Sequence, residues 1–220
     1  MFLIDYLQLV WNNGPTLLDG LIRTLQISLV AIIIATLVGL IGGSALFFGN
    51  WFVRALARLY VDVIRGIPLL VLILISFYGT ALAGWNVSAF TAGAAGLAVF
   101  AGAHLSEIFR GALSSVPHAQ SEAAKAIGLR FWQRLSFVVA PQALRRALPP
   151  WVNVATEIVK GSTLLSIIGV VDLLLATQQA VSRSFATVEL YLTALAIYIA
   201  INHALSMLAA ALERRYLVRI

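Results

Sequence analysis

The sequence contains no cysteine and very little charge. Charged side chains make up 11% of its 220 residues and apolar side chains 61%, whereas soluble domains average about 25% and about 45–50%. The missing cysteine excludes disulfides, thiolate catalysis and cysteine-ligated metal sites. The missing charge excludes a soluble fold and predicts a chain embedded in membrane lipid.

Acidic residues are the scarcer kind of charge, with 9 Asp and Glu against 15 Lys and Arg. In a soluble protein this excess could indicate a nucleic-acid partner. In a helical membrane protein, basic residues gather in cytoplasmic loops, so the excess indicates topology and no nucleic acid is expected. The first basic residue is Arg23, and a cleavable signal peptide needs a basic start, so none is expected.

Catalytic signatures are also missing. The sequence has no Walker A motif, dinucleotide fingerprint, HExxH or nucleophile elbow, so the chain is not expected to be an enzyme. His104, His118 and His203 are scattered along it. No metal site is expected, because these histidines have no ligand spacing.

The intervals between charges locate the membrane spans, since about 20 apolar residues cross a hydrocarbon core in one helix. Residues 24–53 are uncharged and suit one helix, whereas Gly66–Ser106 is uncharged over 41 residues and suits two, joined by a turn near Gly84. Five transmembrane helices are predicted in a single domain, 1–220, at about 18–48, 61–82, 87–107, 147–171 and 189–212, with a loop at about 110–146.

The basic residues predict the orientation of these spans. Twelve of the fifteen fall on one side: Arg54, Arg58, Arg65, Arg110, Lys125, Arg130, Arg134, Arg145, Arg146, Arg214, Arg215 and Arg219. The positive-inside rule makes this side cytoplasmic, with the N-terminus outside and the C-terminus inside. Arg58 and Asp62 are spaced to pair on one helix. Gly39 and Gly43 form a GxxxG, which predicts close helix packing.

Two ionisable residues interrupt the fourth span. Glu157 and Lys160 lie three residues apart, so they share a helix face where each alone would be costly and a pair much less so. One interpretation is a water-filled pathway. The alternative is that the span begins later, which leaves the pair at the interface where Lys160 reaches the headgroups.

The basic loop contains a short predicted helix. Ser121 is a possible N-cap for the helix formers that follow it, and Gly128 interrupts them. Small side chains at 123, 124 and 126 would form a close-contact surface for a partner. The pattern by itself is also compatible with an amphipathic cytoplasmic loop of no special role.

This loop resembles the EAA motif of ABC importer permeases. Glu122-Ala123-Ala124 is followed after three residues by Gly128, and after nine more by Val138-Val139-Ala140-Pro141. Ala140 stands where the pattern prefers Leu. The segments RGIPLLVLILISFYG, SEIFRGALSSVP and PQALRRALPPWVN resemble the polar amino-acid permeases of the histidine, glutamine, glutamate and arginine group.

The resemblance implies an all-α integral membrane bundle of five transmembrane helices with a helical cytoplasmic coupling loop, in a bacterial inner membrane. The implied partners are a pair of cytoplasmic ABC ATPases, a second permease (a copy or a homologue) and a periplasmic amino-acid-binding protein, besides membrane lipid. ATP would be used by the ATPase and no cofactor bound by this chain. The implied ATPase-coupling residues are Glu122, Ala123, Ala124 and Gly128.

A second resemblance lies in the fourth span. Many relatives carry Lys-Asp-Thr-Ser-Leu where this chain has Lys160 followed by Gly161. This stretch lines the substrate cavity in some members, which makes Glu157, Lys160, Ser162 and Thr163 the substrate-pathway candidates. Losing that carboxylate beside a lysine favours an acidic or neutral amino acid over a cationic one.

Two other classes of function are alternatives. A membrane-embedded enzyme needs convergent polar groups, and only Glu157 and Lys160 lie in the interior, with His104 and His203 as distant candidates and no nucleophile beside them. A passive channel or scaffold would share the bundle but has no use for a docking helix. Stimulation of a partner ATPase distinguishes transport from passive movement.

Overall fold

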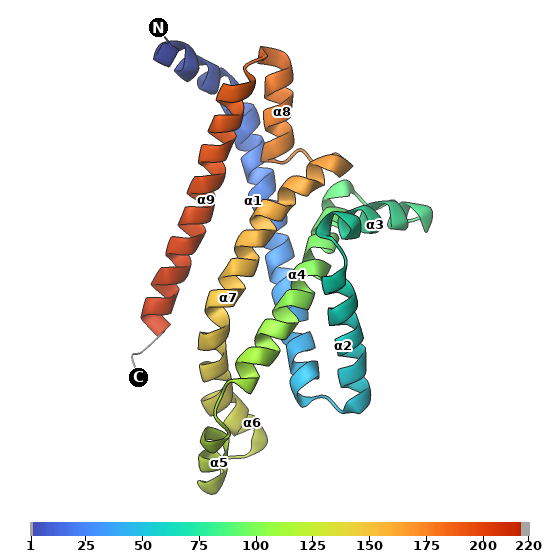
Figure 1. Ribbon diagram of the computed structural model, residues 1–220, viewed down its shortest axis with the longest axis vertical. Helices are drawn as coiled ribbons and strands as arrows, with labels where there is room; N and C mark the ends of the chain where they lie inside the picture. Colours follow the sequence, from blue (N-terminus) through green and yellow to red (C-terminus); the bar gives the residue numbers. More distant parts are fainter. Residues whose placement is uncertain (1, 217–220) are drawn as a thin grey trace. The chain divides into compact units, whose positions relative to one another are not determined.

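The computed structural model describes residues 2–216, and these residues are almost entirely helical, with no strand among them (Figure 1). The elements are α1 (Phe2–Phe48), α2 (Trp51–Gly66), α3 (Leu69–Leu82), α4 (Ala89–Ser114), α5 (His118–Ala126), α6 (Phe131–Arg134), the π-helix η1 (Leu135–Val139), α7 (Ala140–Gly161), the 3-10 helix η2 (Ser162–Ile168), α8 (Leu173–Ser184) and α9 (Thr187–Tyr216). The all-α prediction is confirmed. Arg219, assigned above to the cytoplasmic side, lies outside the described residues.

Three described helices, α1, α4 and α9, are long and apolar enough to cross a membrane. Two bent pairs raise the number to five if each counts as one span: α2 with α3, bent by 106°, and the helical stretch Phe131–Ile168 with α8, bent by 53°. The first bend occurs at Ile67, whose backbone is extended before Pro68. Proline disfavours helical backbone in the residue that precedes it, so a helix cannot run straight through the predicted interval 61–82.

The first helix extends well beyond the predicted span 18–48, since it begins at Phe2. Hydropathy locates the part of a helix that lies in lipid and does not mark where the helix begins. The extra residues are held by tertiary contact, because the Tyr6 hydroxyl lies 2.9 Å from the Thr193 hydroxyl of α9.

The chain divides into two compact units. The first unit comprises Met1–Ile33, Pro68–Ala98 and Ala155–Leu205, and the second comprises Ile34–Ile67, Val99–Val154 and Ser206–Ile220. Several helices, among them α1, α4 and α7, have residues in both units.

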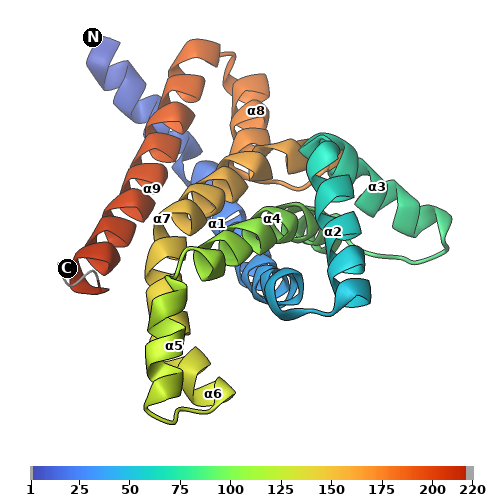
Figure 2. The same cartoon turned by 60° about the horizontal axis from the view of Figure 1, so that its bottom comes forward.

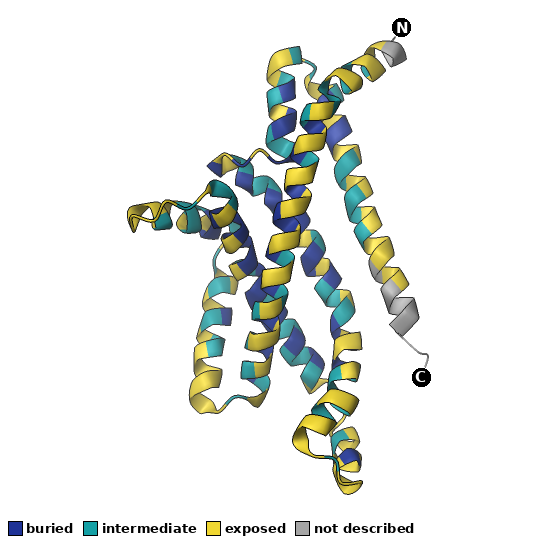
Figure 3. Ribbon diagram, turned by 180° about the vertical axis from the view of Figure 1, so that it is seen from behind, coloured by how far each residue is buried: buried dark blue, intermediate teal, exposed yellow. Residues whose placement is uncertain are grey.

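In the first unit, α8 packs against the early part of α1. Asp172 is fully buried and caps α8, its Oδ1 accepting a hydrogen bond of 2.9 Å from the Leu175 backbone N–H. The Leu173 backbone N–H donates a hydrogen bond of 3.0 Å to the Thr24 hydroxyl of α1. Helix α9 keeps much of its apolar surface uncovered, which Figure 3 shows as exposed and intermediate residues along its length. Such a surface suits lipid or a further membrane helix.

In the second unit, α4 is the central helix. Gly39 and Gly43 of α1 lie directly against Leu105 and Phe109 of α4, which confirms the predicted close packing. Helix α2 is tied to α4 by a hydrogen bond of 2.8 Å from the Tyr60 hydroxyl to the Val99 carbonyl oxygen.

The second unit also contains an ion cluster. Glu107 of α4 is 16% exposed and forms salt bridges with Arg58 of α2 and, at 2.5 Å, with Arg110. The predicted pair of Arg58 and Asp62 is confirmed at 3.9 Å, with both side chains more exposed. Because ion pairs strengthen as they leave water, Glu107 is the stronger partner of Arg58.

Candidate functional site

The basic loop is shorter than predicted. Helix α4 continues to Ser114 and α7 begins at Ala140, so the coupling loop, defined here as residues 115–139, consists of α5, α6 and η1. Arg110, Arg145 and Arg146 therefore lie on the flanking helices rather than in the loop. Arg146 donates a hydrogen bond to the Ser115 carbonyl oxygen, which ties the start of α7 to the start of the loop.

Helix α5 begins earlier than predicted. Pro117 is its N-cap and His118 its first residue, so the prediction of Ser121 as the N-cap is wrong. Proline has no N–H to leave unpaired and its fixed φ suits a helix start, which makes it the better boundary. Ser121 instead lies within α5, where its hydroxyl accepts a hydrogen bond of 3.4 Å from the Arg134 guanidinium.

Helix α5 ends where the glycine predicts. Gly128 has φ +86°, and no atom lies within 4 Å of where a Cβ would be. The Gly128 backbone N–H donates to the Lys125 carbonyl oxygen, and the Leu129 backbone N–H donates to the Ala124 carbonyl oxygen. These two bonds satisfy carbonyls at the end of the helix. Gly128 is therefore required for the left-handed backbone and not for lack of space.

The residues of the predicted coupling set differ in exposure. Glu122, Ala123 and Gly128 are exposed, whereas Ala124 is 5% exposed, on the side where α5 contacts α6 and η1. Figure 2 shows α5 and α6 side by side. Ala124 thus joins α5 to its own loop, and Glu122 and Ala123 form the free face.

Sequence reasoning missed one residue of this free face. Ile127 is 78% exposed directly after α5, beside Gly128. The available signal was its position, because a large aliphatic side chain between Ala126 and the helix-ending Gly128 extends the exposed surface of α5 by one residue.

The π-helix η1 joins this loop to α7. At its end the backbone N–H of Ala140, the first residue of α7, donates to the Leu135 carbonyl, five residues back. Pro141 follows directly, and a proline ring clashes with the carbonyl four residues before it in a regular α-helix. The wider π turn accommodates that ring, so the Ala140-Pro141 end of the motif continues into α7 without breaking it.

The substrate-pathway candidates lie in the first unit, at the junction of α7 and η2. Glu157 and Lys160 are both exposed in the last turns of α7. No ion pair joins them within the described residues, so the expected mutual pairing is not formed. Two opposite charges on one helix face are therefore both available to a ligand.

The two hydroxyl candidates are bonded to the backbone. Ser162 is fully buried, and its hydroxyl donates a hydrogen bond of 2.8 Å to the Val159 carbonyl oxygen. The Thr163 hydroxyl donates a hydrogen bond of 2.7 Å to the Lys160 carbonyl oxygen. Both are side-chain bonds to carbonyls three residues back, at the point where α7 passes into the 3-10 helix η2. Ser162 therefore shapes the helix junction, while the partly exposed Thr163 keeps lone pairs that a ligand could use.

The three histidines lie on three different helices, α4, α5 and α9. In the part of the chain that the structure describes, no three His, Cys, Asp or Glu residues are grouped to hold a metal ion. His104 lies within α4, where its Nδ1 is 3.0 Å from the Phe100 carbonyl oxygen.

Comparison with known proteins places this geometry in a family. Residues 19–218 match the family described as binding-protein-dependent transport system inner membrane component. The chain is 32% identical over 208 residues to the glutamine transport system permease protein GlnP of Escherichia coli, covering 94% of this chain and 95% of that protein. It is 32% identical to the histidine/lysine/arginine/ornithine transport system permease protein HisQ of Salmonella typhimurium, covering 96% and 97%.

Solved structures agree with these relatives. The crystal structure of an amino acid ABC transporter with histidines superposes with a TM-score of 0.87 at 33% identity, covering 96% of this chain and 98% of that one. An inward-facing MetNI methionine ABC transporter shares the fold, with a TM-score of 0.76 at 20% identity, covering 92% and 96%. The chain therefore belongs to the binding-protein-dependent transport system inner membrane components and, within them, to the amino-acid permeases of ABC importers.

Proposed function

We propose that this chain is the membrane subunit through which an ATP-driven importer moves a polar amino acid into the cell by alternating access. It lies in a bacterial inner membrane with its N-terminus outside. Its partners are a pair of cytoplasmic ATPases, which hydrolyse the ATP, a second permease and a periplasmic amino-acid-binding protein. The permease itself carries out no chemical step.

The observation that carries this proposal is the free face of α5. Glu122 and Ala123 are exposed on a helix that is fastened through Ala124 to its own loop. A short helix with small exposed side chains can approach a partner surface closely. Because the loop continues through η1 into α7 without a break, a displacement of α5 by the ATPase is transmitted to that helix.

The unpaired charges at the end of α7 suit the proposed substrate. An α-amino acid is a zwitterion, with a carboxylate that Lys160 can bind and an ammonium group that Glu157 can bind. Lys160 and Glu157 are exposed and not paired with each other. The α-ammonium and α-carboxylate groups are common to all amino acids, so this pair suits the substrate class as a whole. The preference for a neutral or acidic side chain over a cationic one rests on Gly161, which stands where many relatives carry an aspartate.

The proposal is tested by reconstitution. The permease is placed in liposomes with its ATPase and its binding protein, and radiolabelled amino acid is supplied outside with ATP inside. We expect uptake above the outside concentration that requires all three components and hydrolysable ATP. Uptake that proceeds without ATP and stops at equal concentrations would show a passive channel instead.

Lys160→Ala should weaken uptake much more than Arg183→Ala. Both residues are exposed and basic in the first unit, so each variant removes one surface charge. Losing a charged hydrogen bond to the substrate costs about 1.5–3 kcal/mol, which raises the half-saturating concentration about tenfold or more. Initial uptake rates over a range of amino-acid concentrations measure the half-saturating concentration of each variant. Equal, small effects of both variants would remove Lys160 from the pathway.

A further inference from the structure

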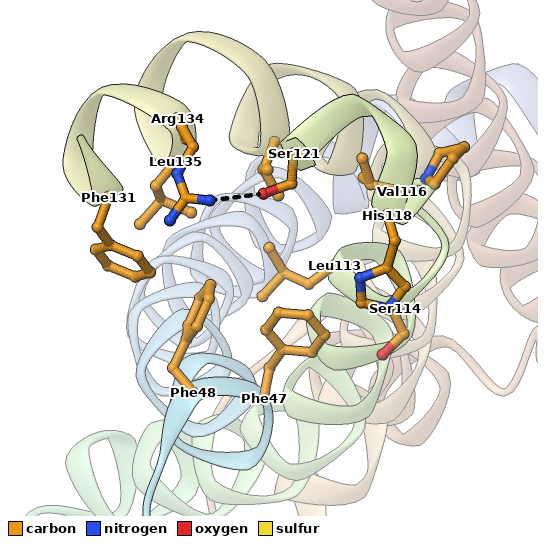
Figure 4. Close-up of a pocket in the computed structure, with 12 residues that line it drawn as sticks. Phe47, Phe48, Leu113, Ser114, Val116, His118, Ser121, Phe131, Arg134 and Leu135 are labelled. Atoms are coloured by element: carbon orange, nitrogen blue, oxygen red, sulfur yellow. Dashed lines mark hydrogen bonds between the residues drawn. The ribbon is translucent and has the colours of Figure 1, made fainter. Parts of the chain in front are cut away.

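A cavity of about 270 Å³ lies within the second unit, inside the coupling loop. Its walls come from the ends of α1 and α4 and from α5, α6 and η1 (Figure 4). The apolar lining includes Phe47, Phe48, Leu113 and Leu135. Ser121, Arg134 and His118 add polar groups to the same walls, so the cavity is amphipathic.

Arg134 is the charged group of this cavity and lacks a full set of partners. Its guanidinium donates to the Ser121 hydroxyl at 3.4 Å, which is long for a hydrogen bond. Its Nε is shielded from solvent and has no hydrogen-bond partner among the described residues. Arg134 as a whole is half-buried, but an N–H donor that is shielded from water and has no partner is costly. Among the described residues that line the cavity there is no acidic side chain, so no lining group neutralises Arg134 and the cavity favours an anion.

The surroundings of the cavity are those of a membrane interface. Helix α1 ends here at Phe48, whose ring packs edge-on against the Phe131 ring with the centroids 5.6 Å apart. Two exposed tryptophans are close in sequence to these two rings: Trp51 follows Phe48 and is 82% exposed, and Trp132 follows Phe131 and is 74% exposed. Tryptophan is enriched where a chain leaves the hydrocarbon core. An anion that also carries apolar chains fits this position better than a free ion.

We infer that this cavity binds the phosphate group of an anionic phospholipid, with Arg134 as its principal cation. The phosphate oxygens accept hydrogen bonds from the Arg134 guanidinium and the Ser121 hydroxyl, and the acyl chains lie over the exposed aromatic side chains. Guanidinium groups recognise phosphate through such paired hydrogen bonds. Basic pockets at the cytoplasmic ends of membrane helices suit anionic headgroups in the same way.

The bound lipid would connect elements that meet at this cavity. It would touch the ends of α1 and α4 together with α5 and α6, all of which line the same space. The inferred role is to hold the coupling loop in register with the membrane surface. The site does not depend on which solute the permease carries.

The test is a titration of the purified full-length chain in non-ionic detergent with phosphatidylglycerol or phosphatidylcholine, followed by native mass spectrometry. We expect phosphatidylglycerol to remain bound and phosphatidylcholine to bind much more weakly. Arg134→Gln should lower phosphatidylglycerol affinity about tenfold, the scale of a lost charge-assisted pair. Arg130→Gln is the matched control, because it removes the same charge from an exposed neighbour that does not line the cavity.

A second variant guards against misfolding of the first. Ser114 lines the cavity, and Ser114→Phe fills space without changing charge, so it should also weaken phosphatidylglycerol binding. Equal losses in Arg134→Gln and Arg130→Gln, or full binding in Ser114→Phe, would overturn the site. Displacement of the lipid by inorganic phosphate at matched concentration would identify a free-phosphate site and overturn the lipid assignment.

Discussion

Gly128→Val is expected to lower ATP-coupled uptake about tenfold or more. Gly128 adopts φ +86°, and left-handed backbone costs an ordinary residue roughly 1–2 kcal/mol and a β-branched one more. The valine variant would restore a negative φ, which redirects the chain after α5 and turns its free face away from the ATPase. Uptake in reconstituted liposomes and co-purification of the ATPase measure the effect.

Two controls separate backbone conformation from side-chain bulk. Gly128→Asn also adds a side chain, but asparagine tolerates left-handed backbone, so this variant should keep most of the uptake. Gly111→Val places the same valine on helical α4, where nothing lies within 4 Å of the new Cβ. If Gly128→Asn fails as completely as Gly128→Val, the left-handed turn is not the reason for the loss.

Gly43→Ala is expected to destabilise the second unit by about 1–3 kcal/mol, the usual cost of overpacking. A Cβ at this position would lie 2.8 Å from the Phe109 Cβ, 2.9 Å from the Ser106 carbonyl oxygen and 3.1 Å from the Arg110 backbone nitrogen. None of these atoms can rotate away, because all belong to the backbone or Cβ positions of α4. The two helices would have to separate.

The same helix provides the matched control. Gly14 of α1 has nothing within 4 Å of a new Cβ, so Gly14→Ala should be neutral or stabilise by up to about 1 kcal/mol through the higher helix propensity of alanine. The midpoint of SDS-induced unfolding in mixed micelles compares the two variants. Equal midpoints would show that α1 and α4 do not pack as closely as the structure indicates.

Features that depend on neighbouring residues were predictable from the sequence. The all-helical fold follows from long uncharged intervals, and the end of α5 follows from Gly128. The pairing of Arg58 with Asp62 follows from their spacing on one helix. These features are local because hydropathy, helix propensity and a glycine's φ act within a few turns of one helix.

Features that depend on distant residues were not predictable. Glu107 is separated from Arg58 by 49 residues, and its place in the ion cluster is decided by how α2 packs on α4. The predicted start of α5 was wrong for a different reason. Pro117 and Ser121 are both acceptable residues at a helix start, and the sequence pattern does not decide between them. For Glu157 and Lys160, spacing permits an ion pair, but side-chain conformation decides whether it forms, and here it does not.

By itself the sequence determined that this chain lies in a membrane as helices and carries an EAA-type loop. The reason is that scarce charge and regular spacing constrain each helix separately. Only the tertiary structure decided which residues of that loop face outward, with Ala124 turned inward and Ile127 left free. It also decided that Arg134 lines a cavity whose other described lining residues include no acidic side chain, because cavities arise from the packing of several helices and leave no trace in the sequence of any one of them.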